Sequence, residues 1–447
     1  MAALWFETAL TETGWANGVR VTLENGLIQS VHLGVQPEAA DERAAIGLPG
    51  VGNLHSHAFQ RAMAGLAETR SPGGDDFWSW REVMYGFVGR LSPDDVQAVA
   101  AQAFAEMVAS GFTRVGEFHY LHNDIDGKPY TDPGELAGRI AAAAAEAGIG
   151  LTLLPVFYAH GGFGGVAPGP RQARFISSVD GFSSVMAASA KAISALPDAR
   201  LGVAPHSLRA VTPEELKAVV AMAPKGPVHI HVAEQTAEVE ACLAWSGARP
   251  VSWLLANAEI DPRWCLVHAT HMDGVETTGL AHAGAVAGLC PITEANLGDG
   301  LFPAIPYRVA GGAFGVGSDS NVRIDLAEEL RLLEYGQRLS QQRRGVAGSG
   351  AELFKAALAG GAQALGERDV GLVAGASADI IELDADHPSL AGRTGDALID
   401  SWVFAAGGSA VRRVWRRGEC LAERGRHVRG GAIGERYRKT LKRILSA

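Results

Sequence analysis

Eight short apolar runs, separated by helix-like segments, constrain the fold of this chain more than any other feature. The runs are rich in Val, Leu and Gly, and they lie near residues 48–54, 112–118, 150–158, 200–206, 227–233, 264–269, 285–292 and 313–319. Helix-start signals occur between them: Ser92 precedes a helix-like segment ending at Gly111, and Thr212 forms a capping box with Glu215. Eight strand–helix repeats predict an α/β fold in which parallel strands close into a TIM-type (β/α)8 barrel.

The two ends of the chain differ from its middle and resemble each other. Residues 1–47 read as short strands with turns, including a hairpin signal at Asn25-Gly26. Residues 370–447 again contain strand-like segments broken by glycine. We therefore expect a catalytic barrel over residues 48–369, inserted into a small β-sandwich domain that both termini build.

Composition and charge exclude several classes of protein. Apolar residues make up 47% of the chain and charged residues 20%, which argues against disorder. The net charge of −10 argues against a nucleic-acid partner, which requires a basic face. We find no run of about 18 apolar residues that would span a membrane. The four cysteines are scattered and the N-terminus has no signal-peptide pattern, so we expect reduced thiols in a cytoplasmic protein.

Two connections are too long to be simple turns, namely residues 58–92 and 159–175. Long connections inside compact domains are usually functional. Both follow predicted barrel strands, so both are expected at the C-terminal face of the barrel, where the active sites of such barrels lie.

Metal-binding side chains cluster at the ends of the predicted strands. His55 and His57 end the first run, and alternate residues of a strand face the same side. His231 ends the fifth run and Asp319 the eighth. Each of these residues alone is weak evidence, but three histidines and one aspartate at strand ends of one barrel predict a metal site with room for a water.

With His268 at the end of the sixth run and Glu234 in an HxxE pattern, this arrangement resembles the amidohydrolase superfamily. The resemblance covers nearly the whole chain, because the split β domain fits as well. It implies that His55, His57, His231 and Asp319 are metal ligands. It also implies that His268 holds the attacked group or its water and that Glu234 shuttles protons.

The number of metal ions is indicated by an absent residue. Superfamily members with two metals use a carboxylated lysine at the end of the fourth strand, but the run ARLGVAPHSLRA contains none, and Lys225 lies in a loop. We therefore expect one divalent metal, with zinc favoured and iron or manganese as alternatives. Together with the HxxE pattern, a single metal resembles the deaminase branch.

A narrower resemblance rests on five separate segments, PGVGNLHSHAFQRAMAGLAE, GEFHYLHND, APHSLRAV, HIHVAEQ and CPITEANLGDG. Together they are similar to the family of formimidoylglutamate deiminases of histidine degradation. This resemblance implies hydrolysis of N-formimino-L-glutamate to N-formyl-L-glutamate and ammonia. It also implies five substrate contacts, which are Gln60, Arg81, Tyr120, His206 and Arg209.

The required chemistry agrees with these residues. Zinc makes water a nucleophile near neutral pH. Asp319 is expected to take the proton of that water, Glu234 to protonate the departing nitrogen, and His268 to stabilise the intermediate. Arginine side chains are suited to bind the two carboxylates of the substrate. Because the chain as a whole is acidic, these arginines must lie together at the site, and Arg81 and Arg209 are the candidates.

Other arginines and aromatic residues in the long connections have weaker roles in this interpretation. Arg61, Arg171 and Arg174 are secondary candidates for substrate contacts, whereas Trp78 and Trp80 are expected to pack the first connection. His229, beside His231, is expected to be an ordinary core histidine.

Two other functions remain open at this point. The first is a single-metal deaminase that acts on a purine or pyrimidine ring, although such a pocket needs a flat apolar slot rather than paired arginines. The second is a metal-binding barrel without catalysis, which would not need the acid–base set of Glu234, His268 and Asp319. The superfamily resemblance also suggests a homodimer.

Overall fold

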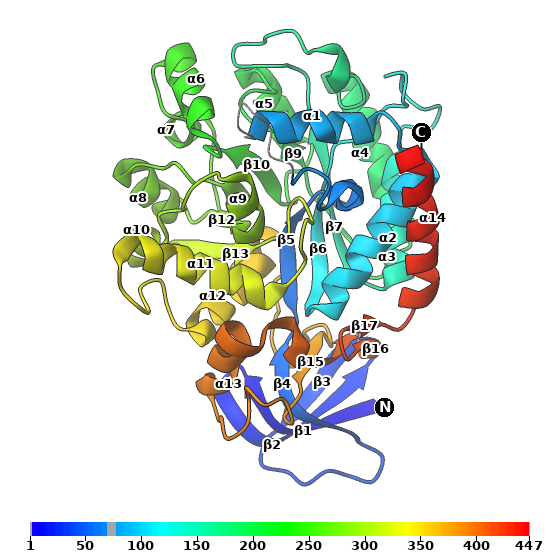
Figure 1. Cartoon of the computed structure of the whole chain (residues 1–447), viewed down its shortest axis with the longest axis vertical. Coiled ribbons are helices and arrows are strands. Elements are labelled where there is room, and N and C mark those ends of the chain that lie inside the picture. The colour runs from blue at the N-terminus through cyan, green and yellow to red at the C-terminus, as the bar shows by residue number, and fades with distance from the viewer. Residues whose placement is uncertain (1, 69–76, 447) are drawn as a thin grey trace.

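Eight strand positions in the middle of the chain form a closed parallel barrel in the computed structural model, which describes residues 2–68 and 77–446 (Figure 1). The fourth position is split in two at Gly202 and Val203. The barrel strands are β5 (Val51–Ser56), β6 (Phe112–His119), β7 (Gly150–Phe157), β8 (Arg200–Leu201) with β9 (Ala204–Pro205), β10 (Val228–Val232), β11 (Trp264–His268), β12 (Val286–Leu289) and β13 (Ala313–Val316).

Isolated bridges close the barrel at two places. Val203 pairs with Val228, and Ser207 with His231, between the fourth and fifth positions. Ser56 pairs with Asp319 between the first and the eighth. All eight predicted runs therefore correspond to barrel strands, and the predicted fold class is confirmed.

Apart from the short strand β8, the barrel strands are almost entirely buried, and helices cover them on the outside (Figure 1). The predicted caps are present, because Ser92 and Thr212 each accept a backbone N–H and complete a capping box. The covering helices are α2 (Pro93–Ala109), α3 (Glu135–Ala147), α4 (Val179–Ile193), α5 (Pro213–Ala221), α6 (Thr236–Ser246), α7 (Pro250–Asn257), α8 (Gly274–His282), α9 (Pro291–Leu297), α10 (Ala304–Val309), α11 (Leu326–Gln341) and α12 (Gly350–Ala364).

Both ends of the chain contribute to one eight-stranded sheet, ordered β17-β16-β15-β14-β4-β1-β2-β3. Asn25 and Gly26, with φ of 52° and 81°, form the predicted hairpin turn between β2 and β3. The strands are β1 (Ala2–Thr11), β2 (Gly14–Glu24), β3 (Leu27–His32), β4 (Glu42–Pro49), β14 (Ile380–Leu383), β15 (Val411–Arg416), β16 (Glu419–Glu423) and β17 (Arg426–His427).

The chain passes from this sheet into the barrel within the first predicted apolar run, residues 48–54. Strand β4 ends at Pro49 and β5 begins at Val51, so Gly50 separates them. A side chain at Gly50 would come within 2.4 Å of the Thr113 side chain, which explains why only glycine fits there.

The C-terminal segment contains helices that our strand-based interpretation did not predict. Helix α13 (Asp396–Ser401) and two short helical turns, Trp402–Ala406 and Gly407–Ala410, precede β15. Helix α14 (Gly430–Ser446) ends the described chain and packs beside α2 (Figure 1).

The first long connection forms two helical pieces above the barrel. A 3-10 turn covers Ala58–Met63, and helix α1 (Phe77–Val88) crosses the end of the barrel opposite the terminal sheet (Figure 1). Residues 69–76 of this connection lie outside the described residues. The second connection contains only a 3-10 turn, Pro170–Gln172. Among the described residues, no helix has the length and apolar character needed to cross a bilayer.

Candidate active site

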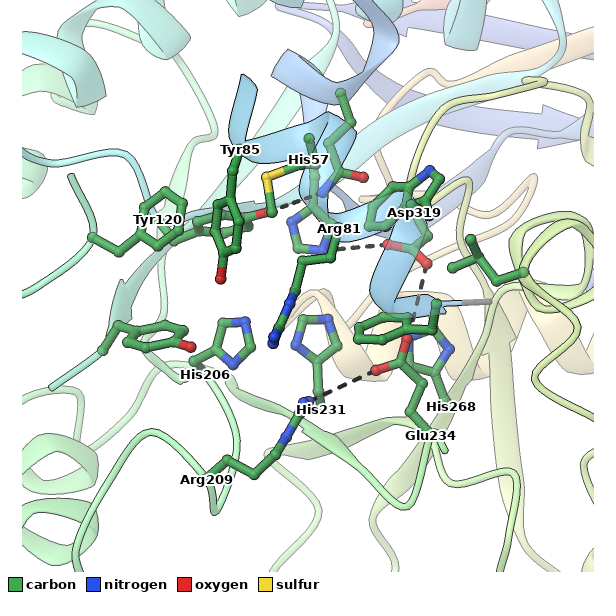
Figure 2. A pocket seen from close by; sticks show the side chains of 17 residues that line it. His57, Arg81, Tyr85, Tyr120, His206, Arg209, His231, Glu234, His268 and Asp319 are labelled. Carbon is green, nitrogen blue, oxygen red and sulfur yellow. Dashed lines mark hydrogen bonds and ion pairs between the residues drawn. The ribbon is translucent and has the colours of Figure 1, made fainter. Parts of the chain in front are cut away.

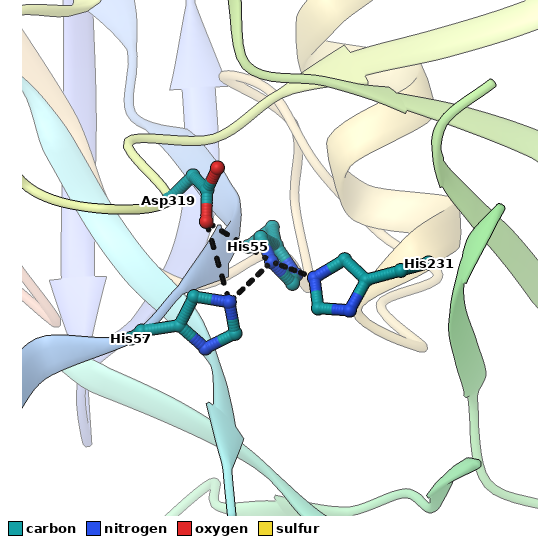
Figure 3. Close-up of side chains that lie close together, drawn as sticks. All are labelled: His55, His57, His231 and Asp319. Carbon is teal, nitrogen blue, oxygen red and sulfur yellow. Dashed lines mark hydrogen bonds and ion pairs between the residues drawn. The ribbon is translucent and has the colours of Figure 1, made fainter. Parts of the chain in front are cut away.

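Three histidines and one aspartate converge at the C-terminal end of the barrel (Figure 3). His55 Nε2 lies 3.1 Å from His57 Nε2 and 3.0 Å from His231 Nε2. Asp319 Oδ1 lies 3.5 Å from His55 Nε2 and 3.3 Å from His57 Nε2. The structure therefore brings together all four predicted ligands, and all four are buried.

The cluster has the spacing expected of side chains that share one divalent ion. Ligand atoms that are each about 2.0–2.2 Å from a zinc ion are typically about 3 Å apart, close to the four distances given above. His57 Nδ1 lies 3.0 Å from the carbonyl oxygen of Phe118 and donates to it, which leaves Nε2 as the free acceptor. Burial lowers the pKa of His55 to about 3. Neutral imidazoles are the form that binds metals, so these four residues are suited to hold a metal ion.

Sharp backbone turns at the strand ends aim the side chains of the site. Nine non-glycine residues among those described have positive φ, and five of them are Ala233, His268, Ala269, Asp319 and Asn321. This conformation costs about 1–2 kcal/mol per residue, so its concentration at one end of the barrel marks a functional region.

Glu234, His268 and Asp319 lie around one point beside the cluster. His268 Nε2 is 3.8 Å from Glu234 Oε1 and 3.8 Å from Asp319 Oδ2. The two oxygens of Asp319 thus have different neighbours, since Oδ1 faces the ligand histidines and Oδ2 faces His268. His268 therefore lies within 3.8 Å of both carboxylates, one of which, Asp319, is itself part of the cluster.

Burial and neighbouring charges set the protonation of this group. Burial raises the pKa of Glu234 to about 7, an effect that the charges of His268 and Arg209 only partly offset. Burial lowers the pKa of His268, but the carboxylates of Glu234, Glu294 and Asp319 outweigh burial and raise it to about 10. A carboxyl group with a pKa near neutrality suits proton transfer, and a cationic imidazole suits stabilisation of negative charge.

A cavity opens above these residues, and two arginines enter it from opposite sides (Figure 2). Arg81 comes from α1, and its guanidinium carbon lies 4.4 Å from the ring centre of Trp78. Arg209 follows the fourth barrel strand, and its Nη2 lies 3.9 Å from Glu234 Oε2. The Nε atoms of both arginines are buried and have no hydrogen-bond partner among the described residues, so both are suited to bind an anion.

The remaining predicted substrate contacts line the same cavity. Gln60 Nε2 donates to the Tyr120 hydroxyl at 2.8 Å, which leaves the hydroxyl proton of Tyr120 available to another acceptor. The His206 ring lies 4.6 Å from the Tyr158 ring and 5.0 Å from the His231 ring. All five predicted contacts are thus lining residues of the cavity.

Comparison with known proteins now places the chain. The sequence profile described as "Amidohydrolase family" matches residues 46–421. The chain belongs to the amidohydrolase family. A second profile, "Formimidoylglutamate deiminase HutF, N-terminal domain", matches residues 1–45 of this amidohydrolase.

Individual relatives support the same assignment. A protein of Pseudomonas aeruginosa named formimidoylglutamate deiminase is 48% identical over 436 residues, which cover 96% of each chain. A crystal structure of an amidohydrolase from Brucella melitensis matches with a TM-score of 0.97 and 50% identity over 100% of both chains. A zinc-bound adenosine deaminase from Xanthomonas campestris shares the fold, with a TM-score of 0.83 and 21% identity over 100% of this chain and 99% of its own.

Several lining residues of the amidohydrolase were not singled out from its sequence. Trp80, expected to pack the first connection, does pack against Phe77 and also lines the cavity. Tyr85, one helical turn after Arg81, also lines it, so the i,i+4 spacing within α1 was an available signal. The structure adds further lining residues, which are Phe77, Met84, Tyr158, Phe175 and Leu297.

The secondary arginine candidates lie outside the group of lining residues. Arg61 donates to the carbonyl oxygens of Asn321 and Val322 at 3.0 and 3.1 Å, and Arg174 donates to that of Leu91 at 2.9 Å. Arg171 pairs with a glutamate of α1 near the surface. The three side chains therefore hold loop segments in place and do not line the cavity.

Proposed function

We propose that this amidohydrolase hydrolyses N-formimino-L-glutamate to N-formyl-L-glutamate and ammonia, using a single divalent metal, with zinc expected. The observation that carries the proposal is that two guanidinium groups enter the cavity that the His/Asp cluster borders. The formimidoylglutamate deiminase of P. aeruginosa, 48% identical, supports the same substrate.

The cavity matches the two carboxylates of this substrate. Arg81 and Arg209 offer charge-assisted hydrogen bonds, which planar guanidinium groups form with both oxygens of a carboxylate. Tyr120 adds a hydroxyl donor, held in position by Gln60. A purine or pyrimidine would leave the two cations without partners, which is unfavourable at partly buried positions.

His55, His57, His231 and Asp319 would hold the metal ion. When bound there, a divalent metal supplies a water nucleophile at neutral pH and polarises the attacked group. The absence of a lysine from the lining residues agrees with one ion rather than two.

The acid–base residues of the chain then have separate tasks. Asp319 Oδ2, which faces His268 rather than the ligand histidines, is placed to accept the proton of the attacking water. Glu234, whose pKa burial raises to about 7, can gain and lose a proton near neutral pH and is placed to deliver one to the departing nitrogen. His268, whose pKa is raised by its carboxylate neighbours, is placed to donate a hydrogen bond to the oxygen that adds to the formimino carbon. Water adds to that carbon, its terminal C–N bond breaks and ammonia leaves.

A substrate panel tests the proposal. Purified protein, reconstituted with one equivalent of zinc, is assayed for ammonia release from N-formimino-L-glutamate, guanine, cytosine and adenosine. We expect turnover of the formimino compound alone. Turnover of a ring substrate without turnover of the formimino compound would replace this proposal with a ring deaminase, and metal binding without any turnover would favour a binding protein.

A further inference from the structure

A buried polar network lies next to the proposed metal-binding site, where the end of β5 meets the segment after β13. Its centre is Asn321, which is fully buried. The side-chain nitrogen Nδ2 of Asn321 lies 3.0 Å from the carbonyl oxygen of Asp319 and 3.1 Å from that of His57. It also lies 3.1 Å from the hydroxyl of Ser56, the residue between His55 and His57.

The other end of the Asn321 side chain is fixed as well. Its Oδ1 accepts the Ser318 hydroxyl at 2.6 Å, and that hydroxyl accepts Asn53 Nδ2 at 2.6 Å. Asn53 Oδ1 in turn accepts the Ser318 backbone N–H at 3.1 Å. These partners determine which end of the Asn321 amide donates and which accepts. Its backbone φ of 55° also suits asparagine, which tolerates the left-handed region better than most residues.

The network joins the two segments that carry three of the four metal ligands. The backbone N–H of His57 donates to Asp319 O at 2.9 Å, and that of Asp319 donates to His55 O at 3.0 Å. Asn321 binds the carbonyls of His57 and Asp319 and is not among the cavity-lining residues. It therefore contacts the backbone of two ligand residues and is set apart from the substrate cavity.

We propose that Asn321 is a positioning residue whose side-chain amide holds the ends of β5 and β13 at the spacing that the metal ligands need. This inference rests on the proposed metal site. The three oxygens around Nδ2 explain the need for an amide. An aspartate would fill the same volume, but its carboxylate would place an acceptor against carbonyl acceptors and push the two segments apart.

The test compares Asn321→Asp with Gln337→Glu as a matched control. Gln337, on α11, is also a buried amide, and its Nε2 donates to the carbonyl oxygen of Phe302 at 2.9 Å. Zinc affinity is measured by competition with a chromophoric chelator, and ligand geometry by the visible spectrum of the cobalt(II)-loaded protein. Loss of a group that orients metal ligands typically weakens binding about 10- to 100-fold. We expect that loss, with an altered cobalt spectrum, for Asn321→Asp and neither change for Gln337→Glu.

Ser318→Ala provides a milder second variant in case Asn321→Asp does not fold. It removes the hydroxyl that fixes Asn321 Oδ1, so we expect the same changes at smaller size. The assignment would be overturned if both variants kept the zinc affinity and the cobalt spectrum of the wild type. If Asn321→Asp does not fold, the same result in Ser318→Ala alone would overturn it. Equal losses in Gln337→Glu would also overturn it, because the effect would then reflect stability. If the unsubstituted protein binds no zinc, the proposed metal site itself fails.

Discussion

Replacing Arg209 by methionine tests whether the cavity recognises a carboxylate. The Arg209 side chain is 16% exposed, and its nearest carboxylate oxygen, Glu234 Oε2, is 3.9 Å away, too far for a hydrogen bond. The guanidinium is thus available to a substrate, and methionine keeps much of its apolar bulk while it removes the donors and the charge.

The size of the effect follows from the lost hydrogen bonds. A hydrogen bond to a charged group contributes about 1.5–3 kcal/mol, and each 1.4 kcal/mol is a factor of ten. We therefore expect KM for N-formimino-L-glutamate to rise about 10- to 150-fold, with zinc content unchanged. Arg209→Lys keeps the charge but loses the planar, two-pronged donor, so its KM should be intermediate.

Steady-state kinetics give kcat and KM separately, and metal analysis checks the site. Arg412→Met is a matched control, because Arg412 pairs with Asp384 at 3.4 Å in the terminal sheet, away from the cavity. A KM for Arg209→Met equal to that of the control, with zinc retained, would remove Arg209 from the substrate site.

Three further predictions concern other residues of the site. Glu234→Gln should keep its zinc but lose about 10²- to 10⁴-fold in kcat; near-normal turnover would exclude Glu234 as the proton donor. Arg81→Met should raise KM about tenfold or more for the reason given for Arg209, and an unchanged KM would limit Arg81 to packing against Trp78. Burial raises the pKa of Glu117 from its ordinary 4.5 to about 8, so between these pH values the folded protein holds a proton that the unfolded chain releases. The free energy of unfolding should therefore fall as pH rises from about 4.5 to 8. Urea unfolding at several pH values should show a smaller fall for Glu117→Gln than for the wild type. The same pH dependence in both proteins would contradict this prediction.

The barrel and the metal ligands could be predicted because both depend on local sequence patterns. Apolar runs of the length of a strand mark the barrel strands, and the C-terminal end of each strand must point to one face. His55, His57, His231 and Asp319 therefore had to lie near one another once the strands were counted correctly. The terminal sheet followed from the strand-like character of both ends.

The loop residues could not be sorted in the same way. Arg61, Arg81 and Arg174 look alike in the sequence, but only Arg81 reaches the cavity, because α1 crosses the barrel mouth. The other two donate hydrogen bonds to backbone carbonyl oxygens, and these partners depend on how the loops pack. Asn321 likewise looks like an ordinary residue after Asp319, and only the folded structure shows its three acceptors.

The most direct test of the central claim is the stoichiometry of one reaction. Protein reconstituted with a single equivalent of zinc is incubated with N-formimino-L-glutamate, and ammonia and N-formyl-L-glutamate are quantified together. We expect one molecule of ammonia and one of N-formyl-L-glutamate for each molecule of substrate consumed. Chelation of the metal should abolish turnover, and restoring one zinc ion per chain should restore it. Equal turnover before and after complete removal of the metal, or no turnover by the zinc-loaded protein, would contradict the central claim.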